Sequence, residues 1–288
     1  MNRITDYQKL QNEIVHWLQN YCQDNNIQSL VIGVSGGIDS ATASSLCALT
    51  GLNTIVVGMP INQESNQEEL SDLHMEDLAS RFINVQIAKI DLTDVFNMFQ
   101  NTLGNHYIDK NVKSNLLALA NSRSRLRMIT LYHLAQMNNA IVVGTGNKVE
   151  DYGIGFYTKY GDGGVDIAPI ADLYKTEVYE LGKTLQVNQK ILDAPPTDGL
   201  WDDARTDEEQ IGTSYELLEW VMEEGLEIDR TELSDDQKEA IDIFKNFHQQ
   251  NKHKMTDIPT FKLNKLQSNF DAKLLVVLFV LWIFVWIW

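Results

Sequence analysis

The sequence contains only two cysteines, Cys22 and Cys47, in 288 residues. They form no C-x-x-C pair, and two isolated thiols cannot build a disulfide framework or a four-ligand zinc cluster. Cys22 ends an apolar helical pattern and Cys47 lies inside another, so we expect both side chains to be buried. A disulfide-stabilised or zinc-stabilised domain is therefore excluded, and a reducing cytoplasm is the expected compartment.

Basic residues are scarce, since 23 Lys and Arg stand against 40 Asp and Glu, which gives a net charge of −17. Nucleic-acid-binding proteins gain much of their affinity by neutralising phosphates, so this balance argues against nucleic acid as a partner. The excess is concentrated between Asp193 and Glu239, where 17 acidic residues stand against three basic ones. We interpret this stretch as a solvated helical surface, which leaves the first two thirds of the chain able to bind anions.

Long apolar runs are absent except at Leu274 to Trp288, which are fifteen consecutive apolar residues. A helix of that length spans roughly 22 Å, less than the ~30 Å of a hydrocarbon core. The first residues, Met1 to Asp6, lack the apolar region of a secretory signal. Residues 264–288 are therefore expected to lie outside a single domain of residues 1–263. They are a membrane-dipping tail, a buried terminal segment or a non-native extension, and membrane contact is expected only there.

What the sequence does contain is a regular alternation of strand and helix patterns. Each short apolar run is followed by a longer segment with helical spacing, which predicts parallel strands with helices on both faces. Pro195 and Pro196 open an acidic region of about 194–250, in which helices resume near Asp207. We therefore predict a doubly wound α/β core with a helical C-terminal region. The expected strands are 29–34, 54–59, 84–90 and 140–143, and the expected helices are 7–21, 38–49, 63–82, 94–103 and 113–136.

The first expected strand runs into a glycine-rich turn that opens a helix, an arrangement typical of phosphate binding. Free backbone N–H groups at a helix start, together with the helix dipole, attract an anion. Glycines permit close approach of the backbone, and the serines add hydroxyl donors. No lysine follows the glycines as a Walker A motif requires, and the G-x-G-x-x-G spacing is also absent. The loop consists of Gly33, Val34, Ser35, Gly36, Gly37, Ile38, Asp39 and Ser40.

The same turn also satisfies G-x-S-x-G, the nucleophile elbow of the α/β-hydrolases. In that alternative Ser35 would be an acyl nucleophile, with His248 or His253 as its base. The adjoining Asp39-Ser40 pair at the helix start suits a metal–phosphate site instead, so the hydrolase is the weaker alternative.

The S-G-G-I-D-S loop resembles the signature of the pyrophosphatase-loop ATP enzymes, which cleave ATP between its α- and β-phosphates and adenylate a substrate. Four further segments resemble those of the ammonia-dependent NAD synthetases. The similarity extends from the first helix to about Phe261, and the absence of an amidase domain matches the ammonia-using form. One departure is an additional residue between Glu150 and Lys159 relative to some members. The matching segments are 121–128, 144–150, 155–166 and 194–197.

The resemblance implies an adenine nucleotide α-hydrolase-like fold and a role for individual residues. The loop from Gly33 to Ser40, with Thr145, Lys175 and Thr197, would contact ATP, and Lys175 would stabilise charge on the transferring phosphate. Asp39 and Glu150 would hold Mg²⁺. No general base for ammonia is assigned, although Asp166 is a candidate. The implied deamido-NAD contacts are Arg125, Lys159, Asp166, His253 and Lys254.

Spacing alone does not choose among Arg123, Arg125 and Arg127, which lie on one expected helix but not on one face. The resemblance implies that Arg125 is the one that contacts deamido-NAD, and an Arg fork suits the carboxylate or phosphate groups of such a substrate. The other two are then expected to be surface or structural residues.

The implied reaction is the ATP-dependent amidation of deamido-NAD by ammonia through an acyl adenylate. Residues 196–201 are expected to belong to a lid that excludes water. A homodimer is implied, with the apolar first helix as a candidate interface. Two alternatives stay open: a tRNA-modifying or other adenylating enzyme of the superfamily, and a nucleotide-binding regulatory module without activity.

Overall fold

The computed structural model describes residues 3–62, 65–104, 112–196 and 206–263. The chain divides after Met255 into two units, and every helix and strand described below belongs to the first. None of the described helices is both long and apolar enough to cross a membrane. The apolar segment Leu274–Trp288 lies outside the described residues, so the three interpretations of it given by the sequence all stay open.

The centre of the first unit is a four-stranded sheet in the order β3-β2-β1-β4, and all of its strand pairs are parallel. Because parallel neighbours need a crossover, each strand is separated from the next by at least one helix. The four predicted strands are confirmed, and their ends differ from the predicted ends by one residue at most. The second strand ends shortly before Pro60, as predicted. The strands are β1 Ser29–Gly33, β2 Asn53–Gly58, β3 Val85–Lys89 and β4 Ala140–Val143.

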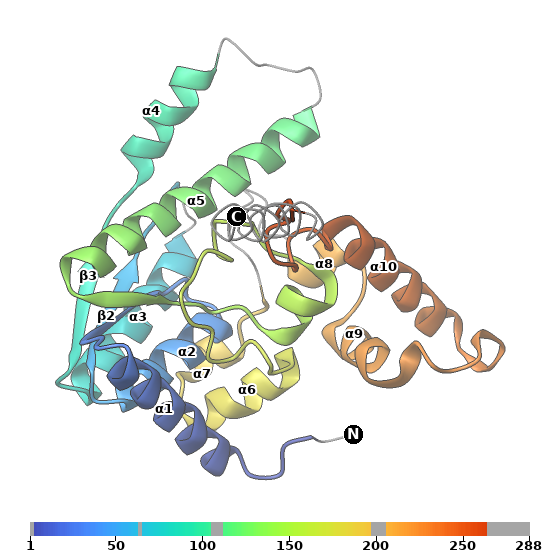
Figure 1. Cartoon of the computed structure of the whole chain (residues 1–288), viewed down its shortest axis with the longest axis horizontal. Helices are drawn as coiled ribbons and strands as arrows, with labels where there is room; N and C mark the ends of the chain where they lie inside the picture. The colour runs from blue at the N-terminus through green and yellow to red at the C-terminus, as the bar shows by residue number, and fades with distance from the viewer. Residues whose placement is uncertain (1–2, 63–64, 105–111, 197–205, 264–288) are drawn as a thin grey trace, which may run out of the picture. The chain divides into compact units, whose positions relative to one another are not determined.

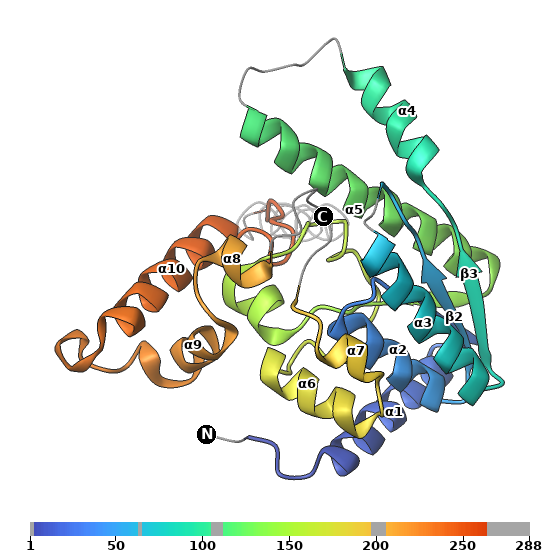
Figure 2. The same ribbon diagram turned by 180° about the vertical axis from the view of Figure 1, so that it is seen from behind.

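Helices cover both faces of this sheet, as predicted (Figures 1 and 2). One face packs against α1, α2, α3 and α6, with Leu18, Leu46 and Leu181 fully buried there. The opposite face packs against α4 and α5, with Phe96 and Ala135 buried against Val31 and Val142. The bounds are α1 Tyr7–Asp24, α2 Ile38–Leu49, α3 Ser65–Arg81, α4 Thr93–Leu103, α5 Val112–Met137, α6 Lys175–Thr184 and α7 Gln189–Leu192.

A second hydrophobic cluster lies in the C-terminal helical region, beside the sheet core. Leu218 and Val221 are fully buried in it together with Val149 and Ile154, which follow β4. This cluster attaches the helical region to the segment after β4, so the two cores form one folded unit. Its elements are η1 Val149–Ile154, α8 Asp207–Ile211, α9 Tyr215–Trp220, η2 Val221–Gly225, η3 Arg230–Glu232 and α10 Asp235–Asn251.

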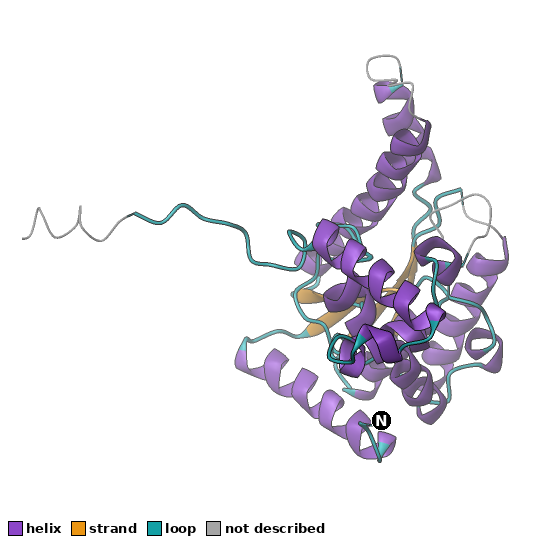
Figure 3. Ribbon diagram, turned by 90° about the vertical axis from the view of Figure 1, so that its right-hand side faces the viewer, coloured by secondary structure: helices purple, strands orange, loops and turns teal. Residues whose placement is uncertain are grey.

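The acidic residues of this region mostly face solvent, as expected, but Asp207 is buried. Both cysteines are buried and free, as predicted. The first helix, α1, has apolar residues both on the core and on the surface. Leu10 and Ile14 pack against the protein's own core, whereas Trp17 and Tyr21 are exposed, so its role as a dimer interface stays a prediction. In Figure 3 helices surround the sheet, and α4 with the start of α5 extends away from it.

Candidate active site

The phosphate-binding turn lies where β1 ends and α2 begins. Gly37 is the N-cap of α2, in an extended conformation and without a side-chain cap. Gly36 has φ +91°, and a Cβ there would lie 2.7 Å from the carbonyl oxygen of Gln67, so this position requires glycine. α3 therefore packs directly against the backbone of the turn.

Two serines stabilise the turn through their hydroxyl groups. Ser40 Oγ accepts from the backbone N–H of Ser35 at 3.1 Å and donates to the carbonyl oxygen of Gly37 at 3.0 Å. Ser35 Oγ lies 3.1 Å from Ser40 Oγ. The hydrolase alternative requires a histidine beside Ser35. His248 Nδ1 instead lies 2.7 Å from the Gly153 carbonyl oxygen, and His253 Nδ1 lies 3.1 Å from that of Gln250.

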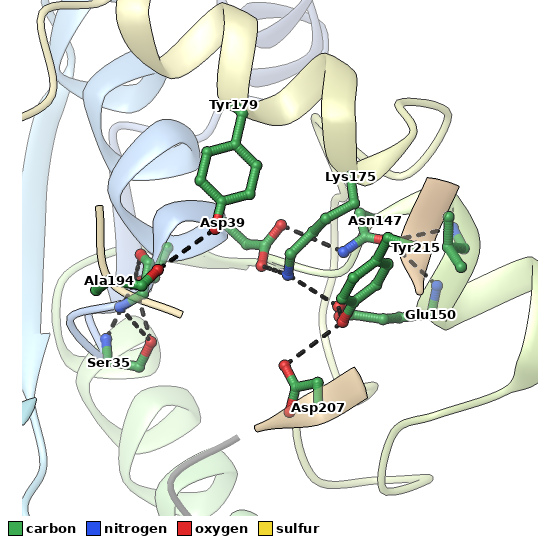
Figure 4. A network of polar contacts seen from close by, with 12 residues as sticks. Ser35, Asp39, Asn147, Glu150, Lys175, Tyr179, Ala194, Asp207 and Tyr215 are labelled. Carbon is green, nitrogen blue, oxygen red and sulfur yellow. Dashed lines mark hydrogen bonds and ion pairs between the residues drawn. The ribbon is translucent and has the colours of Figure 1, made fainter. Parts of the chain in front are cut away.

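The chemical centre of the site is a buried ammonium group held by two carboxylates (Figure 4). Lys175 is the first residue of α6, and its Nζ donates to Asp39 Oδ2 at 2.5 Å and to Glu150 Oε1 at 3.0 Å. Its side chain is 4% exposed. A buried charge is stable only when it is paired, so the two carboxylates explain why a lysine is tolerated there. Two carboxylates thus share one ammonium group, and burial raises the pKa of the second carboxylate, Asp39, above its ordinary value.

The same arrangement shifts the ionisation of its members. Burial by itself lowers the pKa of Lys175, but Asp39 and Glu150 outweigh it, so this pKa lies above its ordinary value. Burial by itself raises the pKa of Glu150, but the charge of Lys175 and the hydroxyl of Tyr215 outweigh it and lower this pKa. Lys175 and Glu150 are therefore both ionised near neutral pH, as an ion pair.

Asn147, to which the sequence pattern assigns no role, connects the two sides of this centre. Its Nδ2 donates to Asp39 Oδ1 at 3.2 Å, and its Oδ1 accepts from the backbone N–H groups of Val149 and Glu150, each at 3.1 Å. Asn147 is fully buried. The segment after β4 is thereby fixed against the first turn of α2. The only signal in the sequence was its position inside the segment 144–150.

Tyr215 is the second residue that the sequence did not reveal. Its hydroxyl donates to Glu150 Oε1 at 2.6 Å, and its ring centre lies 4.9 Å from Lys175 Nζ. Burial beside Glu150 and Asp207 raises the pKa of Tyr215, so the hydroxyl keeps its proton and remains a donor. No local motif marks this tyrosine, which comes from α9 in the acidic region.

A cavity of about 240 Å³ lies at the carboxyl ends of β1, β2 and β4, next to this centre. Ligands of open parallel sheets bind at this edge. Arg127 lines the cavity, and its Nε donates to the carbonyl oxygen of Met59 at 3.1 Å, a bond compatible with the structural role expected for it. Arg123 lies over the ring of Phe96 at 5.0 Å. The predicted residues Gly33, Val34, Ser35, Asp39, Ser40, Thr145 and Glu150 all line the cavity.

Four of the residues implied to contact deamido-NAD gather around one loop. Arg125 lies with its guanidinium 3.3 Å from the carbonyl oxygen of Lys159, and Lys159 Nζ donates to that of His253 at 2.8 Å. Lys254 Nζ donates to the carbonyl oxygen of Tyr157 at 2.7 Å. Tyr157 lines the cavity, so this cationic group lies next to it.

Asp166 is placed differently. Its Oδ1 accepts from the Tyr132 hydroxyl at 3.0 Å and its Oδ2 accepts from the Val142 N–H at 2.8 Å. Its carboxylate is thus bound to α5 and β4, and it is not among the residues that line the cavity. Thr197 and the expected lid up to residue 201 lie outside the described residues. Within the described ranges, no group of three or more His, Cys, Asp or Glu side chains is arranged to hold a metal.

Comparison with known proteins gives a consistent family. The family model described as NAD synthase matches residues 10–258. The NH(3)-dependent NAD(+) synthetase of Alkaliphilus oremlandii is 36% identical over 260 residues, 89% of this chain and 98% of that protein. The protein of the same name from Methanosarcina acetivorans is 36% identical over 227 residues, covering 77% of this chain and 85% of its own.

Solved structures agree with this result. The structure of NMN synthetase from Francisella tularensis superimposes with a TM-score of 0.77 at 32% identity, and covers 90% of this chain and 100% of its own. The NH3-dependent NAD synthetase of Campylobacter jejuni gives a TM-score of 0.70 at 26% identity with the same coverage of both chains. The residues that the family model matches include the phosphate-binding turn, Asp39, Glu150 and Lys175. This chain therefore belongs to the NAD synthase family.

Proposed function

We propose that the chain is an ammonia-dependent NAD synthetase, which converts deamido-NAD to NAD at the expense of ATP. The observation that carries the proposal is the convergence of Asp39, Glu150 and Lys175 beside a phosphate-binding turn. This arrangement suits phosphate chemistry rather than acyl-enzyme chemistry, and the curated relatives are named for this reaction.

In the first step the nicotinate carboxylate attacks the α-phosphorus of ATP, and pyrophosphate leaves to give an acyl adenylate. The step needs positioning and neutralisation of charge more than a side-chain nucleophile. The N–H groups of the turn from Ser35 to Gly37 would bind phosphate oxygens, with Lys175 placing positive charge beside them. In the second step ammonia attacks the acyl carbon, AMP leaves, and the added nitrogen loses a proton to give the amide.

Asp39 and Glu150 fit a magnesium ion. They are oxygen ligands from two separate segments that already converge on a single cation, the ammonium of Lys175. Mg²⁺ is commonly bound by one or two carboxylates with the remaining positions filled by phosphate and water. When bound there, it would neutralise charge on the phosphates of ATP.

Arg125, Lys159, His253 and Lys254 form the proposed binding group for deamido-NAD, since three of their side chains are cationic and they surround the loop beside the cavity. Asp166 remains a proposed substrate contact and Thr197 a proposed ATP contact.

The likeness to the Francisella tularensis NMN synthetase favours a second candidate, the amidation of nicotinate mononucleotide by the same chemistry. One assay separates the candidates. The protein is incubated with ATP, Mg²⁺ and ammonium, with either deamido-NAD or nicotinate mononucleotide, and the amide and AMP are quantified.

We expect a higher kcat/KM for deamido-NAD. A higher value for the mononucleotide would assign the second function, and no amide from either would contradict both. A parallel reaction with glutamine in place of ammonium tests the nitrogen donor, because amide formed from glutamine alone would contradict the use of ammonia.

We also propose a homodimer that forms through α4 and α5. Side chains exposed on these helices include Met98, Phe99, Leu116 and Leu117, which are costly to leave in water. Light scattering of the wild type and of the double variant Phe99→Glu, Leu117→Glu would test it, because a dimer through this surface should become a monomer in the variant.

A further inference from the structure

Tyr215 lies at the centre of the site although it comes from a part of the chain with no motif. It is the first residue of α9, is 3% exposed, and donates its hydroxyl to Glu150 Oε1 at 2.6 Å (Figure 4). The same Oε1 atom accepts from Lys175 Nζ at 3.0 Å. Two donors from two different helices thus fix one carboxylate oxygen.

The hydroxyl has one proton and two carboxylates within reach. Asp207 Oδ2 lies 3.4 Å from it, whereas Glu150 Oε1 lies at 2.6 Å. A strong O–H···O⁻ bond has a length of about 2.5–2.7 Å, so the proton is directed at Glu150. The ring meanwhile packs 4.9 Å from Lys175 Nζ, within the range of a cation–π contact.

Hydrogen bonds at both ends of α9 hold it in this place. Ser214 is its N-cap, and the Tyr215 N–H donates to Glu208 Oε1 at 2.9 Å. One turn later Glu219 accepts from the N–H and the hydroxyl of Thr176, at 3.0 and 2.6 Å. Residues four apart share a helix face, so α9 contacts Glu150 through Tyr215 and the start of α6 through Glu219. α9 therefore contacts the ammonium of Lys175 through the Tyr215 ring and the next residue of α6, Thr176, through Glu219.

We propose that Tyr215 is a positioning residue that orients Glu150 for binding Mg²⁺ with ATP and orients Lys175 beside the same phosphates. This inference rests on the proposed assignment of Glu150 to the metal. Partners that orient a metal ligand typically change metal affinity by about 10–100-fold when they are removed. Loss of the hydroxyl should weaken the binding of Mg²⁺ with ATP and leave the affinity for deamido-NAD unchanged, because the cationic group around Lys159 is separate.

The experiment compares Tyr215→Phe with the wild type and with Tyr179→Phe. The first variant removes the hydroxyl and keeps the ring. The second removes a hydroxyl from α6 that lies 3.5 Å from the Ala194 carbonyl oxygen and makes no contact with Glu150 in the described structure. In kinetics, the Mg²⁺ concentration for half-maximal rate should rise about 10-fold or more in Tyr215→Phe, with KM for deamido-NAD unchanged. Tyr179→Phe should keep the wild-type Mg²⁺ dependence.

A second measurement does not need turnover. The unfolding temperature is recorded against Mg²⁺ concentration in the presence of α,β-methylene-ATP, and Tyr215→Phe should need about 10-fold more Mg²⁺ for half of the rise. The unfolding temperature without ligands checks that the variant folds. An equal Mg²⁺ midpoint in Tyr215→Phe and wild type would overturn the proposal, as would an equal shift in Tyr179→Phe.

The thermal measurement also separates this proposal from the proposed function. If the wild type forms no amide but its Mg²⁺ midpoint still shifts in Tyr215→Phe, the reaction assignment fails and the role of Tyr215 stands. If the wild type shows no Mg²⁺-dependent rise, the role of Tyr215 in metal binding is refuted together with the metal assignment.

Discussion

Replacement of Lys175 by methionine tests the buried ion cluster most directly. Methionine is similar in length and lacks the charge, so the change removes the ammonium group that holds Asp39 and Glu150. Both carboxylates would then face each other, mostly buried, with no cation between them. Removal of one partner from a buried ion pair costs about 3–5 kcal/mol, because a buried charge is left uncompensated.

For a folded unit of this size, that loss corresponds to a decrease in unfolding temperature of roughly 6–15 °C. Differential scanning calorimetry of ligand-free protein measures it. The matched control is Lys183→Met on the same helix, since Lys183 pairs with Glu180 on the surface, with both side chains about half exposed. Such a pair contributes at most about 1 kcal/mol, so this variant should unfold within roughly 3 °C of the wild type.

Addition of Mg²⁺ without nucleotide should raise the unfolding temperature of Lys175→Met more than that of the wild type. In the variant the two carboxylates have lost their cation, whereas in the wild type the ammonium already occupies the position between them. The exchange of labelled pyrophosphate into ATP should fall by about 100-fold or more, because charge on the transferring phosphate is no longer neutralised. Equal stability of Lys175→Met and Lys183→Met would refute the reasoning.

Three further changes test the proposed metal ligands, the phosphate-binding turn and a buried histidine of the core. Asp39→Ala should abolish pyrophosphate release. The fold should be retained, because Lys175 keeps Glu150 as a partner. Undiminished pyrophosphate release in a coupled assay would contradict a role of Asp39 in metal binding. Gly36→Ala should lower stability by about 1–3 kcal/mol and weaken ATP binding, since φ is +91° and Cβ would meet the backbone of α3. Gly51→Ala is the control for the cost of the backbone conformation alone, because Gly51 has φ +74° and open space around it. If urea denaturation shows the same loss of stability in both variants, a clash of the Cβ added in Gly36→Ala with α3 contributes nothing. His74 is fully buried, and burial lowers its pKa from 6.5 to about 4. The unfolded state alone then gains a proton as pH falls from 6.5 to about 4. About 3 kcal/mol of stability present above pH 6.5 should be lost across that window in the wild type, and His74→Asn should lose less; parallel curves for the two would refute this.

Much of the fold followed from local patterns. Apolar runs with β-branched residues predicted the four strands, and their alternation with helices predicted parallel pairing, because a parallel neighbour requires a crossover. The turn from Ser35 to Ser40 could be interpreted in the same way. Gly36 has a positive φ, and glycine is the residue type that adopts this conformation most readily, so the turn could be predicted from the sequence.

The roles of single residues followed less fully. The spacing of Arg123, Arg125 and Arg127 gave their relative directions on α5, but only the packing of α5 against the end of β2 brought Arg127 to the cavity. The role of the first helix as a dimer interface stays a prediction for a related reason. Its apolar stripe shows that one face is buried, and does not show whether the partner is the chain's own core or a second subunit.

The sequence by itself determined the α/β class, the phosphate-binding turn and the residue types needed for phosphate chemistry, because these depend on neighbours within a few positions. Only the tertiary structure decided the strand order, the pairing of Lys175 with Asp39 across 136 positions, and the delivery of Tyr215 to Glu150 across 65. Contacts at such separations depend on how whole helices pack. Local sequence patterns do not predict that the first residue of α9, Tyr215, packs beside the first residue of α6, Lys175.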